Sequence, residues 1–156
     1  MANPTFTIRL ATVLDLPKIV FLLADDPLGA TRERFENPLP VSYQKAFDLI
    51  DQDNNNELLV LENERDGVVG VLQITYIPYL TYQGSWRALF EGVRIDKSHR
   101  AGGLGSMLVL KAIERAKQKN CLLVQLTSDK ARPEAIQFYE KLGFTASHEG
   151  LKLKLA

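Results

Sequence analysis

The sequence predicts an α/β fold (α+β, with a mixed sheet) in which a central β-sheet is flanked by helices. Segments whose apolar residues alternate at strand spacing are interspersed along the chain with segments whose apolar residues recur at helical spacing. Residues 86–127 have the pattern strand, helix, strand, which is typical of a crossover between parallel strands. A chain of 156 residues has the usual size of one domain, so we expect a single domain over residues 1–156.

The expected element order is β-α-α-β-β-β-α-β-α-β-β. Thr12 and Asp15 are rival caps for the first helix, and Pro133 and Gly143 suit the start and the end of the last helix. A short helix is expected around residues 32–35. The expected strands are 6–10, 57–62, 68–77, 86–95, 122–127 and a terminal pair from Phe144 that includes 151–155; the expected helices are 12–24, 42–51, 104–119 and 133–142.

Composition excludes several classes of partner. Basic and acidic residues both number 19, so the formal net charge is zero, and we expect no nucleic-acid partner. No basic N-terminal region precedes an apolar stretch, and no run of about 18 apolar residues occurs, so we expect a cytoplasmic protein that does not enter a membrane. No Cys, His or carboxylate cluster has metal-ligand spacing, so no metal is expected.

A glycine-rich turn between the strand 86–95 and the helix 104–119 predicts a phosphate site. Glycine lets the backbone approach a ligand, and unpaired N–H groups at a helix start attract anions. Ser106 and Met107 stand where a P-loop needs Lys and Ser or Thr, and Leu108 replaces the third glycine of a dinucleotide fingerprint. The alternative is a helix start that binds no ligand.

Two motifs resemble those of a known family. Arg100-x-x-Gly103-x-Gly105 is similar to the first signature of the GCN5-related N-acetyltransferases (GNAT), and Ala135-x-x-x-Tyr139-x-x-x-Gly143-Phe144 is similar to the second. The resemblance implies a splayed central sheet, acetyl-CoA as co-substrate and an amine as acceptor. It places the pyrophosphate on Arg100, Ala101, Gly102, Gly103, Leu104, Gly105 and Ser106, and pantetheine along Val93, Arg94 and Ile95. Arg132 stands where the family often has Asn, and it could reach a phosphate instead.

Glu91 is the candidate general base. An alkylammonium has a pKa of about 10 and must lose a proton before it attacks a thioester. Strand alternation predicts that Glu91 shares a sheet face with Val93 and Ile95, where a carboxylate could accept that proton directly or through water. Family members that acetylate polyamines carry Glu at an equivalent position. The alternative is a solvent-facing strand glutamate.

Tyr139 is the candidate general acid. The resemblance implies that its phenol protonates the departing thiolate, while a backbone N–H of residues 93–95 polarises the thioester carbonyl. The alternative is a core tyrosine, because Tyr139 also belongs to the apolar stripe of its helix. His99 and His148 are expected to be surface histidines. Asp25 and Asp26 either attract a cationic amine or simply form a turn.

The predicted function is acetyl transfer to a primary amine of a small molecule. The alternatives are acetylation of a protein lysine or N-terminus, and a non-catalytic acyl-CoA sensor. A toxin that acetylates a nucleic acid is disfavoured by the zero net charge. A homodimer could form if the aromatic-rich residues 76–86 pair edges between two copies.

Overall fold

The computed structural model describes residues 3–156 and divides the chain into two compact units. Unit 1 is Met1–Gln125 and contains the β-sheet and the glycine-rich loop. Unit 2 is Leu126–Ala156 and contains the last helix. The single domain expected over residues 1–156 stays a prediction. No helix within residues 3–156 combines the length and the apolar character needed to cross a bilayer.

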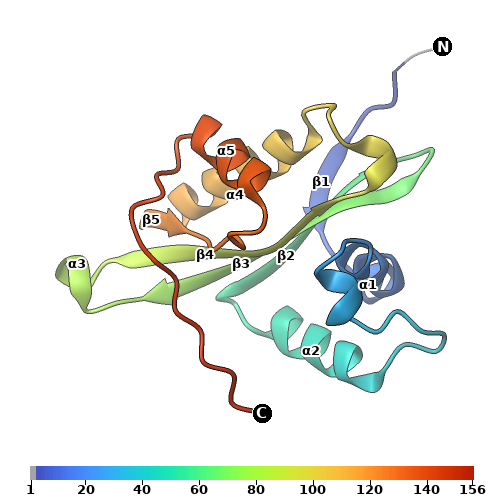
Figure 1. The fold of residues 1–156 in the computed structure, drawn as a ribbon, viewed down its shortest axis with the longest axis horizontal. Helices are drawn as coiled ribbons and strands as arrows, with labels where there is room; N and C mark the ends of the chain where they lie inside the picture. Colours follow the sequence, from blue (N-terminus) through green and yellow to red (C-terminus); the bar gives the residue numbers. More distant parts are fainter. Residues whose placement is uncertain (1–2) are drawn as a thin grey trace. The chain divides into compact units, whose positions relative to one another are not determined.

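Unit 1 is built on a five-stranded mixed sheet with the order β1-β2-β3-β4-β5 (Figure 1). Neighbouring strands run antiparallel, except β4 and β5, which run parallel as the strand–helix–strand pattern predicts. The fold class is therefore confirmed. The strands are β1 (Thr7–Leu10), β2 (Asn56–Asn63), β3 (Gly67–Pro78), β4 (Trp86–Ile95) and β5 (Cys121–Gln125).

Helices cover both faces of this sheet. α1 (Leu16–Ala24) and α2 (Val41–Gln52) pack on one face, and α4 (Leu104–Gln118) packs on the other (Figure 1). The 3-10 turns η1, η2 and η3 span Val13–Asp15, Gly29–Thr31 and Lys97–His99.

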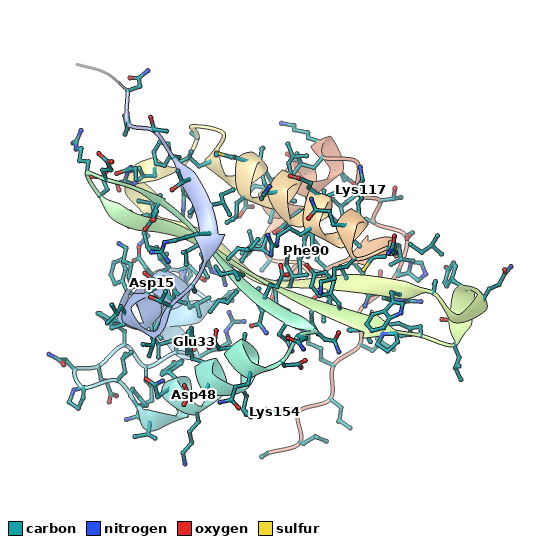
Figure 2. The ribbon with its side chains drawn as sticks, turned by 180° about the vertical axis from the view of Figure 1, so that it is seen from behind. Asp15, Glu33, Asp48, Phe90, Lys117 and Lys154 are labelled. Carbon is teal, nitrogen blue, oxygen red and sulfur yellow. The ribbon has the colours of Figure 1, made fainter. Side chains whose placement is uncertain are left out.

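Alternation along the strands divides the apolar core between the two faces. Val60 and Val71 join the cluster beneath α1 and α2. Their sequence neighbours Leu59 and Leu72 pair across β2 and β3 and point to the α4 side. Phe90 of β4, 2% exposed, lies on that side too (Figure 2). Because both faces are buried, these strands are nearly continuous apolar runs in the sequence.

The hairpin of β3 and β4 ends in the α3 turn (Thr81–Gly84) (Figure 1). Tyr82, Gln83 and Gly84 have φ angles of 53°, 61° and 73°, so this turn is left-handed. Leu80 and Tyr82 are exposed at the tip. The homodimer expected through residues 76–86 stays a prediction.

Two expectations near the first helix need correction. Residues Val13–Asp15 form η1, and α1 begins at Leu16 with Asp15 at its N-cap position. Thr12 caps η1 instead, and its N–H donates to the Asp15 carboxylate at 2.7 Å. The short helix expected around residues 32–35 is wrong. The helical turn lies at η2, because the Asp26 carboxylate accepts hydrogen bonds from the first N–H groups of that turn.

Unit 2 contains α5 (Pro133–Lys141), with Pro133 in its first turn as predicted. Gly143 follows the helix with a φ of 95°, which is typical of a C′ glycine. The strands expected from Phe144 onward, including residues 151–155, are not formed. Leu151, Leu153 and Leu155 are 94%, 84% and 90% exposed. Alternation alone does not make a strand, because the backbone groups need another strand as partner.

We expect Gly29→Ala to destabilise unit 1. A Cβ at Gly29 would lie 1.9 Å from the Leu23 carbonyl oxygen, so the backbone must shift. Overpacking of this kind costs about 1–3 kcal/mol of unfolding free energy, which urea denaturation measures. Gly102→Ala is the control, because the nearest atom that its Cβ would meet among the described residues, its chain neighbours aside, is the His99 carbonyl oxygen at 3.8 Å. Equal losses in the two variants would contradict the steric argument.

Candidate active site

β4 carries a β-bulge in the middle of the expected site. Between the cross-strand pairs Val71↔Arg94 and Gln73↔Glu91, β4 uses one residue more than β3. Gly92 lies in this extra segment with a φ of 63°, which glycine adopts at no steric cost. A bulge of this kind bends the strand and turns the side chains that follow it.

The bulge corrects the expected direction of Glu91. The partners of Glu91 and Arg94 on β3 are Gln73 and Val71, which are two residues apart and therefore share a face. Val71 belongs to the core cluster beneath α1 and α2, so both side chains point to that face. Ile95 pairs with Gly70 and points to the opposite face. The expectation that Glu91 shares a face with Val93 and Ile95 is therefore wrong at Ile95, since the extra residue reverses the alternation. The Glu91 side chain is exposed.

The outer edge of β4 is open beyond Leu89. The parallel ladder with β5 ends at the pair Leu89↔Gln125, whereas β4 continues to Ile95. Within the described part of unit 1, the outward-facing backbone groups of Phe90–Ile95 have no strand partner. The predicted splay between these strands is confirmed, and an amide-containing ligand can hydrogen-bond to this edge.

The loop that follows β4 forms a concave array of N–H groups at the start of α4. Ala101 and Gly103 have φ angles of 65° and 78°. The first intrahelical hydrogen bond runs from the Met107 N–H to the Gly103 carbonyl, at 3.0 Å. The N–H groups of Leu104, Gly105 and Ser106 precede it, so they point out of the helix end beside the positive pole of its dipole. Such an array binds anions.

The space above these glycines is open. Among the described residues, no atom beyond Gly103 and its two chain neighbours lies within 4 Å of the position that a Cβ at Gly103 would take. The packing of the protein itself therefore does not demand glycine there, whereas the positive φ favours it. The residues present fit the pyrophosphate of a coenzyme A.

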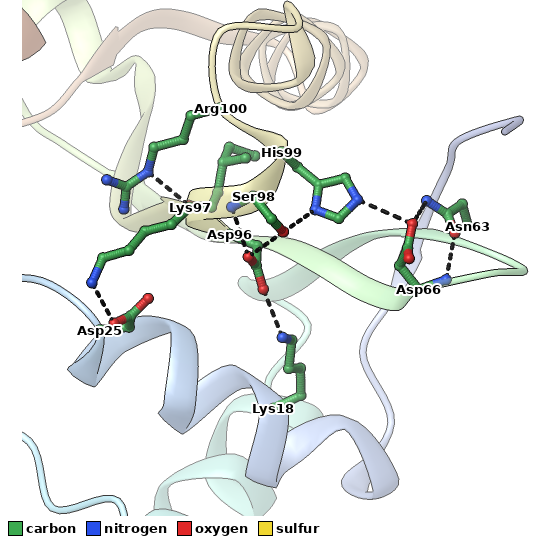
Figure 3. A network of polar contacts seen from close by, with 10 residues as sticks. Lys18, Asp25, Asn63, Asp66, Asp96, Lys97, Ser98, His99 and Arg100 are labelled. Atoms are coloured by element: carbon green, nitrogen blue, oxygen red, sulfur yellow. Dashed lines mark hydrogen bonds and ion pairs between the residues drawn. The ribbon is translucent and has the colours of Figure 1, made fainter. Parts of the chain in front are cut away.

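Side chains from distant elements hold this loop (Figure 3). The Asp96 carboxylate accepts from Lys18 Nζ of α1 at 2.7 Å and from the Ser98 N–H at 3.1 Å. The Lys18 ammonium, helped by Ser98, lowers the pKa of Asp96 to about 2. Asp96 therefore remains charged at neutral pH and ties the loop to α1.

His99 ties the same loop to the turn between β2 and β3 (Figure 3). Its Nε2 lies 3.1 Å from Asp66 Oδ2, and its Nδ1 lies 2.9 Å from Ser98 Oγ. The hydrogen bonds from Asn63 and His99 lower the pKa of Asp66. The His99 side chain is 18% exposed and therefore partly buried in its turn, whereas His148 is exposed.

Arginines and aspartates near β4 are paired. Arg94 Nε donates to Asp26 Oδ2 at 2.8 Å, so Asp26 is buried and turn-forming rather than open to an amine. Asp25 Oδ1 accepts from Lys97 Nζ at 2.7 Å. Arg100 is exposed, and its Nε donates to the Ile95 carbonyl at 3.1 Å.

Glu91, Val93–Ile95 and residues 100–106 thus lie on one strand, loop and helix of unit 1. Arg132 and Tyr139 belong to unit 2, where Arg132 is at the N-cap position of α5. The half-buried Tyr139 ring makes edge contacts with Phe138 and Phe144, with centroids 5.0 and 5.6 Å apart. The predicted roles of these residues stay predictions. Residues 3–156 contain no group of three side chains placed to hold a metal.

Sequence reasoning missed the residues that support the loop. Asp96-x-Ser98 is a recognisable turn pattern, in which an Asp carboxylate accepts from an N–H two residues on. Nothing local marks Lys18 or Asp66, which lie far from the loop along the chain and meet it only in the folded protein.

An open strand edge that runs into an anion-binding helix start is typical of N-acyltransferases. The chain belongs to the acetyltransferase (GNAT) family, whose model matches residues 25–144. A glucosamine 6-phosphate N-acetyltransferase of Trypanosoma brucei brucei is 34% identical over 88 residues, and the match covers 56% of this chain and 58% of that relative.

Two solved structures are similar over nearly the whole chain. A protein described as a transcriptional regulator from Bacillus halodurans C-125 is 59% identical, with a TM-score of 0.94; the match covers 97% of this chain and 100% of that one. An acetyltransferase of Trypanosoma brucei is 27% identical, with a TM-score of 0.79 and the same two coverages. Both support the fold assignment.

We expect Lys18→Met to destabilise the protein in a pH-dependent way. Because the folded-state pKa of Asp96 lies below its usual 3.8, the pair contributes stability above about pH 4, and this contribution is lost as the pH falls toward 2. Lys18 is partly exposed, so solvent screening limits the loss at pH 7 to about 1 kcal/mol. Urea denaturation of wild type and Lys18→Met at pH 7 and pH 3 measures the loss of unfolding free energy at each pH.

The difference in unfolding free energy between wild type and Lys18→Met should shrink at pH 3. The difference that remains comes from the lost contact of Lys18 with the Phe21 ring. Lys45→Met, on the exposed side of α2, is the matched control and should cost little at either pH. A difference that stays constant with pH would show that the Asp96 pair is not its source.

Proposed function

We propose that this protein is an acetyl-CoA-dependent N-acetyltransferase that acts on a primary amine of a small molecule. The observation that carries the proposal is the open edge of β4 leading into the helix start at Gly103, where positive φ and open space coincide. Family membership supports the use of an acyl-CoA. The pyrophosphate would bind residues 100–106, with Arg132 as a further phosphate contact, and pantetheine would lie along Val93–Ile95.

An amino sugar phosphate is the first acceptor to test, because one relative is a glucosamine 6-phosphate N-acetyltransferase. The shared region is little more than half of either chain, so the panel should also include other small amines and lysine peptides. Preference for a peptide would favour the alternative of protein acetylation.

Each proposed catalytic group has one task. Glu91 accepts a proton from the ammonium, directly or through water, so that the amine can attack. A backbone N–H of Val93–Ile95 donates to the thioester carbonyl as negative charge develops on its oxygen. The Tyr139 hydroxyl gives a proton to the departing sulfur. The C–N bond forms and the C–S bond breaks, so the acetyl group moves from sulfur to nitrogen; the nitrogen loses its second proton to solvent, Tyr139 regains one from solvent, and free coenzyme A leaves.

The alternative is a regulatory protein that binds acyl-CoA without turnover, and the relative described as a transcriptional regulator favours it. The zero net charge of this chain disfavours direct binding to DNA, because phosphate contacts require a basic surface. Steady release of free thiol from acetyl-CoA in the presence of an amine would decide for the enzyme.

Gly103→Asp should abolish acetyl-CoA binding. A carboxylate would enter the anion site, and the positive φ is strained for Asp. Calorimetry with acetyl-CoA measures the affinity. Gly84→Asp imposes a similar positive φ and the same charge at the hairpin tip, so it should bind as wild type does. Unchanged affinity in Gly103→Asp would refute the assigned pyrophosphate site.

Glu91→Gln should lower kcat by about 100-fold while acetyl-CoA affinity stays the same. The loss should diminish at high pH, where more of the amine is already deprotonated. A pH series of kcat measures this, with Glu64→Gln in the exposed β2–β3 turn as control. Activity near wild type at every pH would reduce Glu91 to a surface residue.

Tyr139→Phe should slow the chemical step by about 10- to 1,000-fold with little change in folding. Phe keeps the ring contacts with Phe138 and Phe144 and removes only the hydroxyl. Single-turnover rates test this, and Tyr82→Phe at the exposed hairpin tip is the control. Equal rates in wild type and Tyr139→Phe would mean that Tyr139 is only a packing residue.

A further inference from the structure

Arg87 of β4 is a half-buried cation for which the protein supplies no counter-charge. Its Nη1 donates to the Gln125 side-chain oxygen at 3.0 Å, and its Nη2 donates to Thr81 Oγ1 at 3.1 Å, and both acceptors are neutral. No carboxylate among the described residues pairs with it. The other half-buried arginines of unit 1 each pair with a carboxylate: Arg9, Arg94 and Arg115. Because a charge that loses water normally gains a partner of opposite sign, Arg87 is the exception that needs a reason.

One donor of the same guanidinium has no acceptor. The Nε of Arg87 is buried and makes no hydrogen bond to a described residue. A guanidinium carries five N–H donors in a planar fork, and the bonds to Gln125 and Thr81 use only two of them. Buried polar groups without a partner are rare in native proteins, because such a group loses its water without compensation. Arg87 therefore has the capacity to donate to further oxygen atoms.

The turn at the end of the β3–β4 hairpin folds around this guanidinium. The Arg87 Cζ atom lies 3.7 Å from the centroid of the Tyr79 ring and 5.4 Å from that of the Tyr82 ring. Tyr82 and Gln83 have φ angles of 53° and 61°, in the left-handed region that is unfavourable for residues with a side chain. Strained backbone of this kind concentrates at functional sites. The aromatic rings hold Arg87 in place without neutralising its charge.

Arg87 lies on the same strand face as Glu91. The two residues are four apart on β4, and the β4 ladder with β3 has no register shift between them, so strand alternation places both side chains on one face. Gln125, which binds Arg87 Nη1, pairs with Leu89, the residue midway between them on that face. Four residues of strand span about 13 Å. Because both side chains are long, a small acceptor whose amine lies at Glu91 can reach Arg87 with its other end.

We propose that Arg87 binds an anionic group, a phosphate or a carboxylate, at the far end of the acceptor. This inference rests on the proposed function, in which the amine of the acceptor lies at Glu91. A planar guanidinium binds two oxygens of such a group at once, so it recognises the direction of the acceptor as well as its charge. Arg87 contacts no reacting atom. Its role is to select anionic amines over neutral ones.

The first test compares amines that differ only in the anionic group. Glucosamine 6-phosphate and glucosamine form one pair, and 6-aminohexanoate and pentylamine form the other. In at least one pair, wild type should have a kcat/KM about 10- to 100-fold higher for the anionic amine, which corresponds to a hydrogen bond between charged groups. A preference in the glucosamine pair alone identifies a phosphate site, and a preference in both pairs identifies a site for either anion.

Arg87→Met should remove this preference. Its kcat/KM for the anionic amine should fall about 10- to 100-fold through KM, because the lost contact is the same before and during the reaction, whereas the neutral amine should react as with wild type. Arg65→Met, in the exposed β2–β3 turn, removes the same charge and is the matched control that should keep the preference. If Arg87→Met keeps it too, Arg87 only anchors the hairpin turn and the inference is overturned, while the proposed function stands.

A titration of wild type with inorganic phosphate, and then with acetate, needs neither turnover nor a folded variant. At least one of the two anions should shift the side-chain NMR signal of the Arg87 Nε–H, whereas anions at the glycine-rich loop shift the backbone signals of that loop. If wild type acetylates none of the four amines, the proposed function fails, and this titration decides whether Arg87 binds an anion. Equal kcat/KM values within both pairs would overturn the inference, and so would an unchanged Nε–H signal where no amine reacts.

Discussion

The site depends on β4 being paired along one edge only. β4 is a central strand up to Leu89 and an edge strand from Phe90, because β5 stops pairing there. An unpaired edge in the interior of a fold would normally be a cost, since backbone groups lose water without gaining a partner. Here the edge has no strand partner within the described part of unit 1, and the chain immediately continues into the array of N–H groups at the start of α4. Strand edge and helix end together form the backbone surface that we propose for a long, amide-rich anionic ligand.

An arrangement made of backbone needs side chains to hold it in place, and α1 and the turn after it supply most of them. Lys18 reaches the loop through Asp96, and Asp26 reaches the bulge through Arg94. Leu23 packs against the bulge from the same helix. The buried pair resists movement, because separating its charges would leave one of them uncompensated in a poor solvent. Because these contacts come from α1 and the turn that directly follows it, a displacement of α1 would disturb the strand edge and the loop together.

The sequence by itself determined the features that neighbouring residues control. The ends of β4, the start of α4 after Gly103 and the start of α5 at Pro133 follow from local rules of spacing, capping and glycine geometry. The two family motifs also lie in such local segments, so the glycine-rich start of α4, where we propose the anion site, could be predicted before the fold was known. The fold class followed as well, because it depends on the order of the elements rather than on their exact contacts.

Only the tertiary structure decided the features that depend on residues far apart in the chain. The bulge in β4 appears only in its register with β3, and it turned Glu91 away from the face of Ile95 that simple alternation predicts. Lys18 has no local signal as a partner of Asp96, because 78 residues separate them. The alternating leucines from Leu151 do not form a strand, because a strand exists only where another supplies its hydrogen bonds. Neighbouring residues set the local conformation. Strand register and pairing depend instead on contacts between segments far apart in the chain, and a single sequence does not specify those contacts residue by residue.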